Sequence, residues 1–194
     1  MIKLPQVSLV AMTGLGYKTQ EHIEAIKKSC EGIEFGEVKL IQLGSIKDVD
    51  SWNKAIIYEL PKHIFTDYCI LIHHDGYIRN PNLWDGSWLE YDFIGAVWPL
   101  PTDSYSYRTP SGRLIRVGNS VSFRSRKLMN LVATQPREYH YGNNNEDGQI
   151  CVWLRDWLEE QGCKFAPLEI AIHFSKEHEI PENKNIKTFA FHQI

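Results

Sequence analysis

One short stretch, YCILIHHDGYIRN at residues 68–80, most constrains what this chain can fold into. It opens with the apolar run 69–72 and then turns abruptly polar. A short apolar run without a periodic polar face is typical of a strand buried on both faces, as in a parallel sheet. Ligands of open α/β sheets bind beyond the carboxyl ends of such strands. The pattern predicts that His73, His74 and Asp75 lie at a binding edge, although ordinary loop residues after a strand would look the same.

Two strands and two helices are predicted before this stretch. Strands at 7–11 and 38–43 alternate with a helix at 19–31 and with a second helix that Asp50 or Ser51 would cap. The order β-α-β-α-β is typical of a parallel, right-handed α/β arrangement. We therefore expect an α/β fold whose central sheet is mostly parallel and flanked by helices.

The loop after the first strand contains two glycines, Gly14 and Gly16. It lacks the third glycine of a dinucleotide-binding fingerprint, so it does not predict a Rossmann site. We interpret it as a loop that borders a nucleotide, with Ala11 and Thr13 as candidate donor contacts.

The second half of the chain contains further predicted elements and one long loop. Loop 99–112 carries Tyr105 and Tyr107, which either pack on the surface or contact an acceptor. Before this loop we expect a strand at 91–98, and after it a hairpin-like pair of strands at 114–117 and 120–123 around Gly118-Asn119. A helix capped by Ser125 follows, and then a polar loop ending at 143–147. The last expected elements are a helix that carries Trp153 and Trp157 and ends at Gly162, and an extended segment at 165–172.

Length and composition exclude several classes of protein. A chain of 194 residues is long enough for one domain with a real core, and the net charge of -3 argues against a nucleic-acid binder with a basic surface. None of the four cysteines forms a CxxC pair, so a zinc knuckle is not indicated. There is no signal peptide and no apolar run long enough for a membrane span, so we expect a cytoplasmic protein without a transmembrane segment.

Three polar clusters are candidates for chemistry: residues 73–75, the pair Glu146-Asp147, and His192 near the C-terminus. The acidic pair has a structural explanation, because the N-terminus of a helix attracts carboxylates. A carboxylate oxygen and an imidazole nitrogen also suit Mn²⁺ or Mg²⁺, with phosphate oxygens completing the coordination. Of the other histidines, we expect His22, His63 and His140 to be solvated or hydrogen-bonded residues.

Five segments together resemble a known family. They are ELPKHIFTDYCILIHHDGYIRNP, EYDFIGAVWP, VGNSVSFRSRKLM, NNNEDGQICVWLRD and FAFHQI, which span about residues 52–192 in this order. The family comprises small bacterial and viral proteins catalogued as a domain of unknown function, and it is similar to GT-A glycosyltransferases. The resemblance implies one GT-A-like domain, with a nucleotide-binding half at about 1–80 and an acceptor-side half at about 81–194.

The resemblance also implies roles for individual residues. The Asp-any-Asp motif of GT-A enzymes, which binds a divalent ion and the donor, matches His73-His74-Asp75, with His in place of the first Asp. Asp75 would be a metal ligand, His73 a second ligand or a ribose contact, and His74 a donor contact. The later acidic pair maps onto Glu146-Asp147, with Asp147 as the base, and the C-terminal histidine of the metal site maps onto His192. Gly118 and Asn119 would border the acceptor, and Trp98 would stack on a sugar or pack in the core.

The activity implied is transfer of a sugar from a nucleotide-diphospho donor, a UDP-sugar, to a hydroxyl of a glycan, glycolipid or other acceptor. Inversion and assistance by Mn²⁺ or Mg²⁺ are expected. Two alternatives stay open: a nucleotidyltransferase on a similar core, and an inactive protein that binds a nucleotide-sugar.

Overall fold

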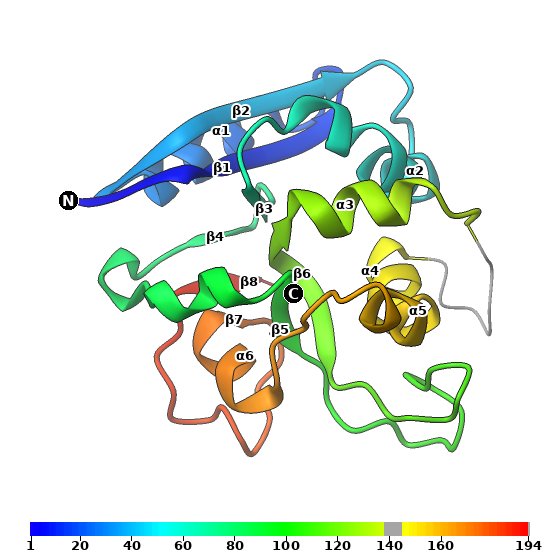
Figure 1. Cartoon of the computed structure of the whole chain (residues 1–194). Coiled ribbons are helices and arrows are strands. Elements are labelled where there is room, and N and C mark those ends of the chain that lie inside the picture. The colour runs from blue at the N-terminus through cyan, green and yellow to red at the C-terminus, as the bar shows by residue number, and fades with distance from the viewer. Residues whose placement is uncertain (138–144, 194) are drawn as a thin grey trace.

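The computed structural model describes residues 1–137 and 145–193, without the side chains of residues 119 and 120. His140 and residues 143–144 of the predicted polar loop lie outside this description. The largest sheet has five strands in the order β2-β1-β3-β6-β5 (Figure 1). β1 is parallel to β2 and β3, whereas β6 runs antiparallel to β3 and β5. The bounds are β1 (Ile2–Gly14), β2 (Ile33–Leu43), β3 (Tyr68–Ile72), β5 (Phe93–Val97) and β6 (Val117–Ser125). The predicted mixed, mostly parallel sheet is confirmed.

A second sheet of three strands adjoins the first where β3 ends. Its order is β4-β8-β7, with β4 antiparallel and β7 parallel to the C-terminal strand β8 (Figure 1). The strands are β4 (Gly76–Ile78), β7 (Ser175–Lys176) and β8 (Ala190–His192). The strand β8 is therefore held beside the turn that follows β3.

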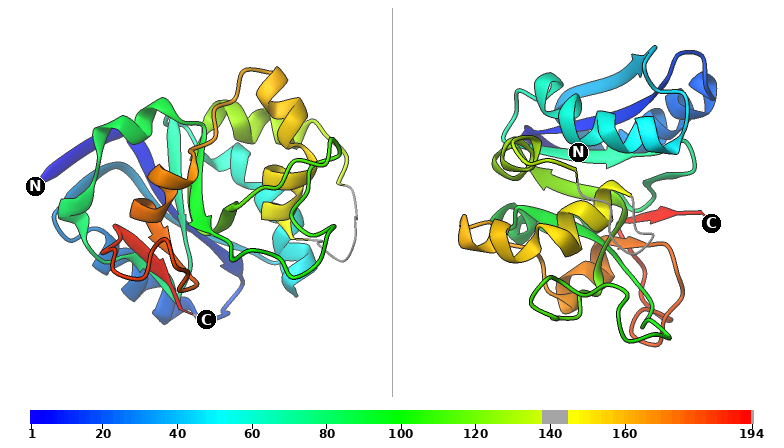
Figure 2. Two further views of the ribbon diagram at one scale, coloured as in Figure 1. Left: turned by 90° about the horizontal axis from the view of Figure 1, so that it is seen from below. Right: turned by 90° about the vertical axis from the view of Figure 1, so that its right-hand side faces the viewer.

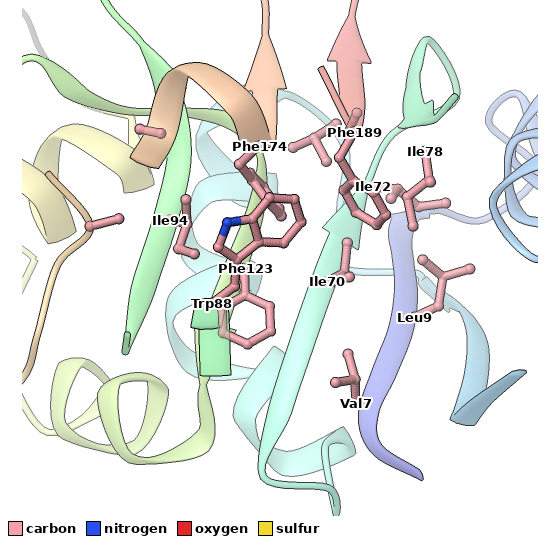
Figure 3. Close-up of a cluster of buried hydrophobic side chains, with 14 of the residues drawn as sticks. Val7, Leu9, Ile70, Ile72, Ile78, Trp88, Ile94, Phe123, Phe174 and Phe189 are labelled. Atoms are coloured by element: carbon pink, nitrogen blue, oxygen red, sulfur yellow. The ribbon is translucent and has the colours of Figure 1, made fainter. Parts of the chain in front are cut away.

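The central strands are buried on both faces, as their apolar run predicted. Val7 and Leu9 of β1 and Ile70 and Ile72 of β3 pack on one face, in a cluster with Trp88, Phe174 and Phe189 (Figure 3). Val10, Met12, Cys69 and Leu71 point to the opposite face. This alternation between two buried faces is the reason that the sequence of β3 shows no polar side.

Helices cover both faces of the sheet. Ala25 of α1 and Phe174 of α6 join the cluster on the first face, and Ile56 of α2 and Met129 of α3 join the cluster on the other. The α-helices are α1 (Thr19–Ser29), α2 (Val49–Tyr58), α3 (Arg126–Ala133), α4 (Glu146–Gly148), α5 (Arg155–Glu160) and α6 (Leu168–Phe174). Short 3-10 turns are η1 (Leu60–His63), η2 (Pro81–Leu83) and η3 (Gly86–Glu90). No helix in the described ranges is long and apolar enough to cross a membrane.

Two of the predicted helix starts have different outcomes. Ser125 caps α3 as predicted, because its side chain accepts from the backbone N–H of Leu128. The cap predicted for α2 is wrong, because the helix is capped by Asp48 and not by Asp50 or Ser51. The carboxylate of Asp48 accepts from the backbone N–H of Ser51, and the hydroxyl of Ser51 accepts from the backbone N–H of Asp48. Such a reciprocal capping box satisfies two free donors, and it starts the helix earlier than predicted.

The predicted hairpin at Gly118-Asn119 is also wrong, because β6 runs straight through it. A Cβ at Gly118 would lie 2.3 Å from Cη2 of Trp98. The glycine therefore marks the close approach of an indole ring to a strand and not a turn.

Two predictions for the last third of the chain need correction. Segment 165–172 is not extended throughout, since α6 begins at Leu168 after Pro167 and packs Ala171 and Phe174 into the core. The single Trp-rich helix is instead a series of α4, a π-helical segment η4 (Gln149–Trp153) and α5. The loop between β5 and β6 lies beside α5 (Figure 2). Arg113 of this loop forms an ion pair with α5, because its Nη2 lies 2.7 Å from Oδ1 of Asp156.

Candidate functional site

A tight turn at the carboxyl end of β3 presents the His-His-Asp triplet. The N–H of His73 donates to the carbonyl of Gly76 over 2.7 Å, and the chain then leaves as β4. The backbone carbonyl of Asp75 accepts from the N–H of Gln193, just past the end of β8. The turn is thus anchored to the C-terminal strand, and the triplet lies where both sheets meet.

Asp75 and His192 are brought into direct contact. Oδ1 of Asp75 lies 3.2 Å from Nε2 of His192. β8 places His192 opposite Gly76, and a Cβ at that glycine would lie 2.7 Å from Cδ2 of the imidazole. The missing side chain of Gly76 therefore makes room for the His192 ring beside Asp75.

Glu177 holds the other side of the same imidazole. Its Oε1 lies 3.1 Å from Nδ1 of His192. Burial opposes the charged imidazole, but the carboxylates of Glu177 and Asp75 outweigh burial and raise the pKa of His192. Partial burial likewise opposes ionisation of Asp75, but the charge of His192, the largest opposing effect, helps to lower the pKa of this carboxyl. Asp75 is therefore a carboxylate at neutral pH.

A pocket of about 570 Å³ opens beside the triplet. It is lined by the end of β1 from Met12 onward, the loop after it, the start of α2, and His22, His73 and His74. A volume of this size lies within the range of small-molecule sites. Trp52 of α2 shapes the wall: its indole N–H donates to the carbonyl of Met12 over 2.8 Å, and its ring lies 5.4 Å from that of His73. Thr13 lines the pocket, whereas Ala11 is fully buried in the strand before it.

A lysine ammonium lies at the edge of this pocket. Nζ of Lys18 is 2.6 Å from Nε2 of His74. An ammonium can only donate, so this nitrogen of His74 is an acceptor and cannot also donate to Oδ2 of Asp75, which lies 3.3 Å away. Burial lowers the pKa of His74, which fits a neutral ring. Oδ2 of Asp75 therefore faces a second acceptor, and a cation placed between them would relieve the repulsion.

The acidic pair at the start of α4 is buried, and its two members differ. Oε1 of Glu146 lies 2.7 Å from Nη2 of Arg124 on β6, so this carboxylate has a buried counterion. Oδ1 of Asp147 accepts from the N–H of Gly148 over 2.7 Å. Burial, together with the charge of Glu146, raises the pKa of Asp147, and the charge of Glu177 adds to this effect.

The residues expected at the acceptor side lie around β6. Trp98 is buried, and its ring stacks on Tyr107 with centroids 4.7 Å apart. Its indole also covers Gly118, whose carbonyl lies 3.9 Å from Sγ of Cys151. The backbone of Asn119 pairs with Ala96 of β5, and its side chain lies outside the described atoms.

Sequence reasoning found the triplet and His192 but missed four neighbours: Lys18, Trp52, Arg124 and Glu177. His22 is hydrogen-bonded as expected, with Nδ1 2.8 Å from the carbonyl of Lys18, and it also lines the pocket. No local motif marks Glu177, because only the pairing of β7 with β8 brings it beside His192. Trp52 stands at an apolar position of a predicted helix, so the sequence does not distinguish it from a residue of the hydrophobic core.

The donor atoms fit a weakly held cation completed by substrate. Asp75 and His192 offer one oxygen and one nitrogen on side chains that are 38% and 21% exposed. Within residues 1–137 and 145–193, no three His, Cys, Asp or Glu side chains are grouped to hold a metal. A closed structural zinc site needs four ligands, whereas Mg²⁺ keeps few protein ligands and several waters or phosphate oxygens.

Comparison with solved structures supports the fold. A similar one is the "Crystal structure of a glycosyltransferase involved in the glycosylation of the major capsid of PBCV-1". The likeness has a TM-score of 0.60 at 11% sequence identity and covers 96% of this chain and 91% of that chain. At this identity it shows a shared mixed α/β architecture.

The search of curated proteins gives no match. The family model described as "Protein of unknown function (DUF5672)" matches residues 42–192, most of the chain, which therefore belongs to this family.

Proposed function

We propose that this protein is a GT-A-type glycosyltransferase. It moves a sugar from a nucleotide-diphospho donor, a UDP-sugar, to a hydroxyl of a glycan, glycolipid or other acceptor. One observation carries the proposal: the pocket at the carboxyl ends of β1 and β3 adjoins a contact between Asp75 and His192 over 3.2 Å. A nucleotide-sized hollow next to a carboxylate and an imidazole, two common ligand types for divalent ions, supports binding of a nucleotide-diphospho donor.

The pocket suits the nucleoside part of the donor. Trp52 and His73 supply flat rings, and Thr13 supplies a hydroxyl, beside the apolar Met12 and Ile46. Flat, partly apolar walls with a few polar groups favour a planar base. With the nucleoside here, its diphosphate extends toward Asp75 and the Lys18 ammonium.

Asp75 and His192 would hold the Mn²⁺ or Mg²⁺ ion, with His73 beside them, since its ring lies 5.2 Å from that of His192. When bound, such an ion supplies positive charge against the leaving diphosphate. Lys18 adds a second positive charge at the same edge. The residues of the chain thus orient the donor and stabilise the charge that develops as the nucleoside diphosphate departs.

Asp147 is the proposed base. A base must accept the proton of the acceptor hydroxyl as this oxygen attacks the anomeric carbon, which inverts the configuration there. The raised pKa of Asp147 makes its carboxylate a stronger proton acceptor than an ordinary aspartate. Glu146 cannot share this role while it is paired with Arg124.

Product analysis tests the proposal. Purified protein is incubated with a panel of UDP-sugars, Mn²⁺ and candidate acceptors. Release of UDP that is lost in Asp75→Ala and retained in the control Asp67→Ala, at an exposed position, supports sugar transfer. Release of pyrophosphate would instead identify a nucleotidyltransferase. UDP release unchanged in Asp75→Ala would contradict the site.

A second candidate is a protein that binds a nucleotide-sugar without transferring the sugar. The burial of Asp147 favours it, because only 7% of this residue is exposed and an acceptor hydroxyl must reach a base directly or through one water. Binding of UDP without turnover over a broad range of acceptors would support this alternative.

A further inference from the structure

The geometry points to Glu177 as a positioning residue: it holds Nδ1 of His192 so that Nε2 of the same ring is presented to Asp75. This inference rests on the proposed function in one respect, the placement of a divalent ion at Asp75 and His192. It adds to the site a residue that lies outside the acidic and histidine motifs.

A single row of residues across the small sheet places Glu177. β4 sets Gly76 opposite His192, and β7 pairs Ser175 with Ala190 and Lys176 with Phe191. Continuing this parallel register by one residue brings Glu177 opposite His192. The order across the sheet is therefore Gly76, His192 and Glu177. The imidazole contacts the carboxylate of Asp75, the residue before Gly76, at 3.2 Å on one side and that of Glu177 at 3.1 Å on the other.

The hydrogen bonding of Glu177 is directed to this one ring. Its side chain is only 12% exposed. Its Oε2 atom is buried and makes no hydrogen bond among the residues that the structure describes. A buried carboxylate without full hydrogen bonding destabilises a fold. A contribution to stability therefore does not explain why a glutamate is buried at position 177, whereas a role in orienting His192 does.

The chemistry of imidazole ligands explains what the contact achieves. A histidine that binds a metal through one nitrogen commonly donates its other N–H to a carboxylate, which fixes the tautomer and ring orientation. Glu177 and Asp75 compete for the proton of the neutral ring, and Glu177 is the more buried carboxylate, with 12% of its side chain exposed against 38% for Asp75. The neutral ring therefore keeps its proton on Nδ1, and the lone pair of Nε2 is left for a cation held together with Asp75. Removal of such a partner typically weakens metal binding by about 10- to 100-fold.

Two measurements test the role of Glu177. Mn²⁺ binding is followed by the loss of the free-ion signal in electron paramagnetic resonance, for wild type, Glu177→Ala and Glu177→Gln. We expect affinity to fall about 10- to 100-fold in Glu177→Ala, and less in Glu177→Gln, whose amide oxygen still accepts from Nδ1. The matched control is Glu179→Ala, which removes the same charge two residues away at a position 59% exposed; it should bind Mn²⁺ as wild type does.

The second measurement needs no metal. Nitrogen-15 chemical shifts of neutral His192 report its tautomer: wild type should carry the proton on Nδ1, and Glu177→Ala should lose this preference while still melting cooperatively. If both variants keep the wild-type tautomer, Glu177 does not position the ring. If wild type has the expected tautomer but binds no Mn²⁺, the proposed metal site fails and the role of Glu177 toward His192 stands.

Discussion

Nε2 of His192 lies 3.2 Å from Oδ1 of Asp75, although the two residues are 117 positions apart in the chain. Two short strands create this contact, because β4 leaves the turn after Asp75 and immediately pairs with β8. The contact joins the central sheet to the C-terminus. The geometry of the proposed metal site therefore depends on how the small sheet holds the His192 ring.

Gly76→Ala should separate His192 from Asp75. The new Cβ would lie 2.7 Å from Cδ2 of His192 and 3.0 Å from Cγ2 of Val121, so the imidazole must move. We expect a loss of about 1–3 kcal/mol of stability, as is typical of overpacking, together with weaker Mn²⁺ binding. Gly86→Ala is the control, since a Cβ at that position would have no neighbour within 4 Å. Equal Mn²⁺ affinity in wild type and Gly76→Ala would show that the position of the ring is irrelevant.

Asp147→Asn should stabilise the protein while it removes sugar transfer. Because the pKa of Asp147 is raised in the folded state, mainly by burial, the folded protein favours the protonated form. The wild type therefore loses stability as the pH rises above the ordinary aspartate pKa of about 3.9 and up to the raised value. Melting temperatures from pH 4 to pH 8 should show a growing advantage of Asp147→Asn. The exposed control Asp67→Asn should show no such trend, and a pH-independent gap for Asp147→Asn would refute the explanation.

Arg124→Met should be strongly destabilising, because it leaves Glu146 as an uncompensated buried charge. Loss of one partner of a buried pair typically costs about 3–5 kcal/mol. The double variant Arg124→Met/Glu146→Gln should recover part of this loss, because the unpaired charge is then removed. Urea unfolding of the two single variants and the double variant measures the coupling. A double variant that is no more stable than Arg124→Met would mean that the charge of Glu146 is not the cause.

Lys18→Met should weaken binding of UDP but not of uridine. The ammonium lies 2.6 Å from His74 at the edge of the pocket, where the diphosphate is placed. A hydrogen bond to a charged group contributes about 1.5–3 kcal/mol, which is roughly a tenfold change in affinity or more. Titration calorimetry with both ligands gives the ratio, and Lys27→Met is the control, because Lys27 pairs with Glu24 on the surface of α1. Equal weakening for uridine would place Lys18 at the nucleoside instead.

Local patterns predicted the parts of the fold that local interactions determine. The apolar run of β3 and the Ser125 cap of α3 depend on neighbouring residues, and both were predicted. The straight course of β6 through Gly118 depends on the distant ring of Trp98, which no local pattern shows. In the site, His73, His74, Asp75 and His192 had recognisable motifs, whereas Glu177 reaches His192 only through strand pairing. Its role required the register of β7 and β8.

The melting temperature of the wild-type protein with UDP, measured with and without Mn²⁺, tests the central claim most directly. A ligand that binds only the folded state raises this temperature by mass action. We predict that UDP raises it, that Mn²⁺ increases the shift, and that Asp75→Ala abolishes the increase due to Mn²⁺. No shift with UDP or any other nucleoside diphosphate, with or without Mn²⁺, would contradict a nucleotide-sugar site in this pocket.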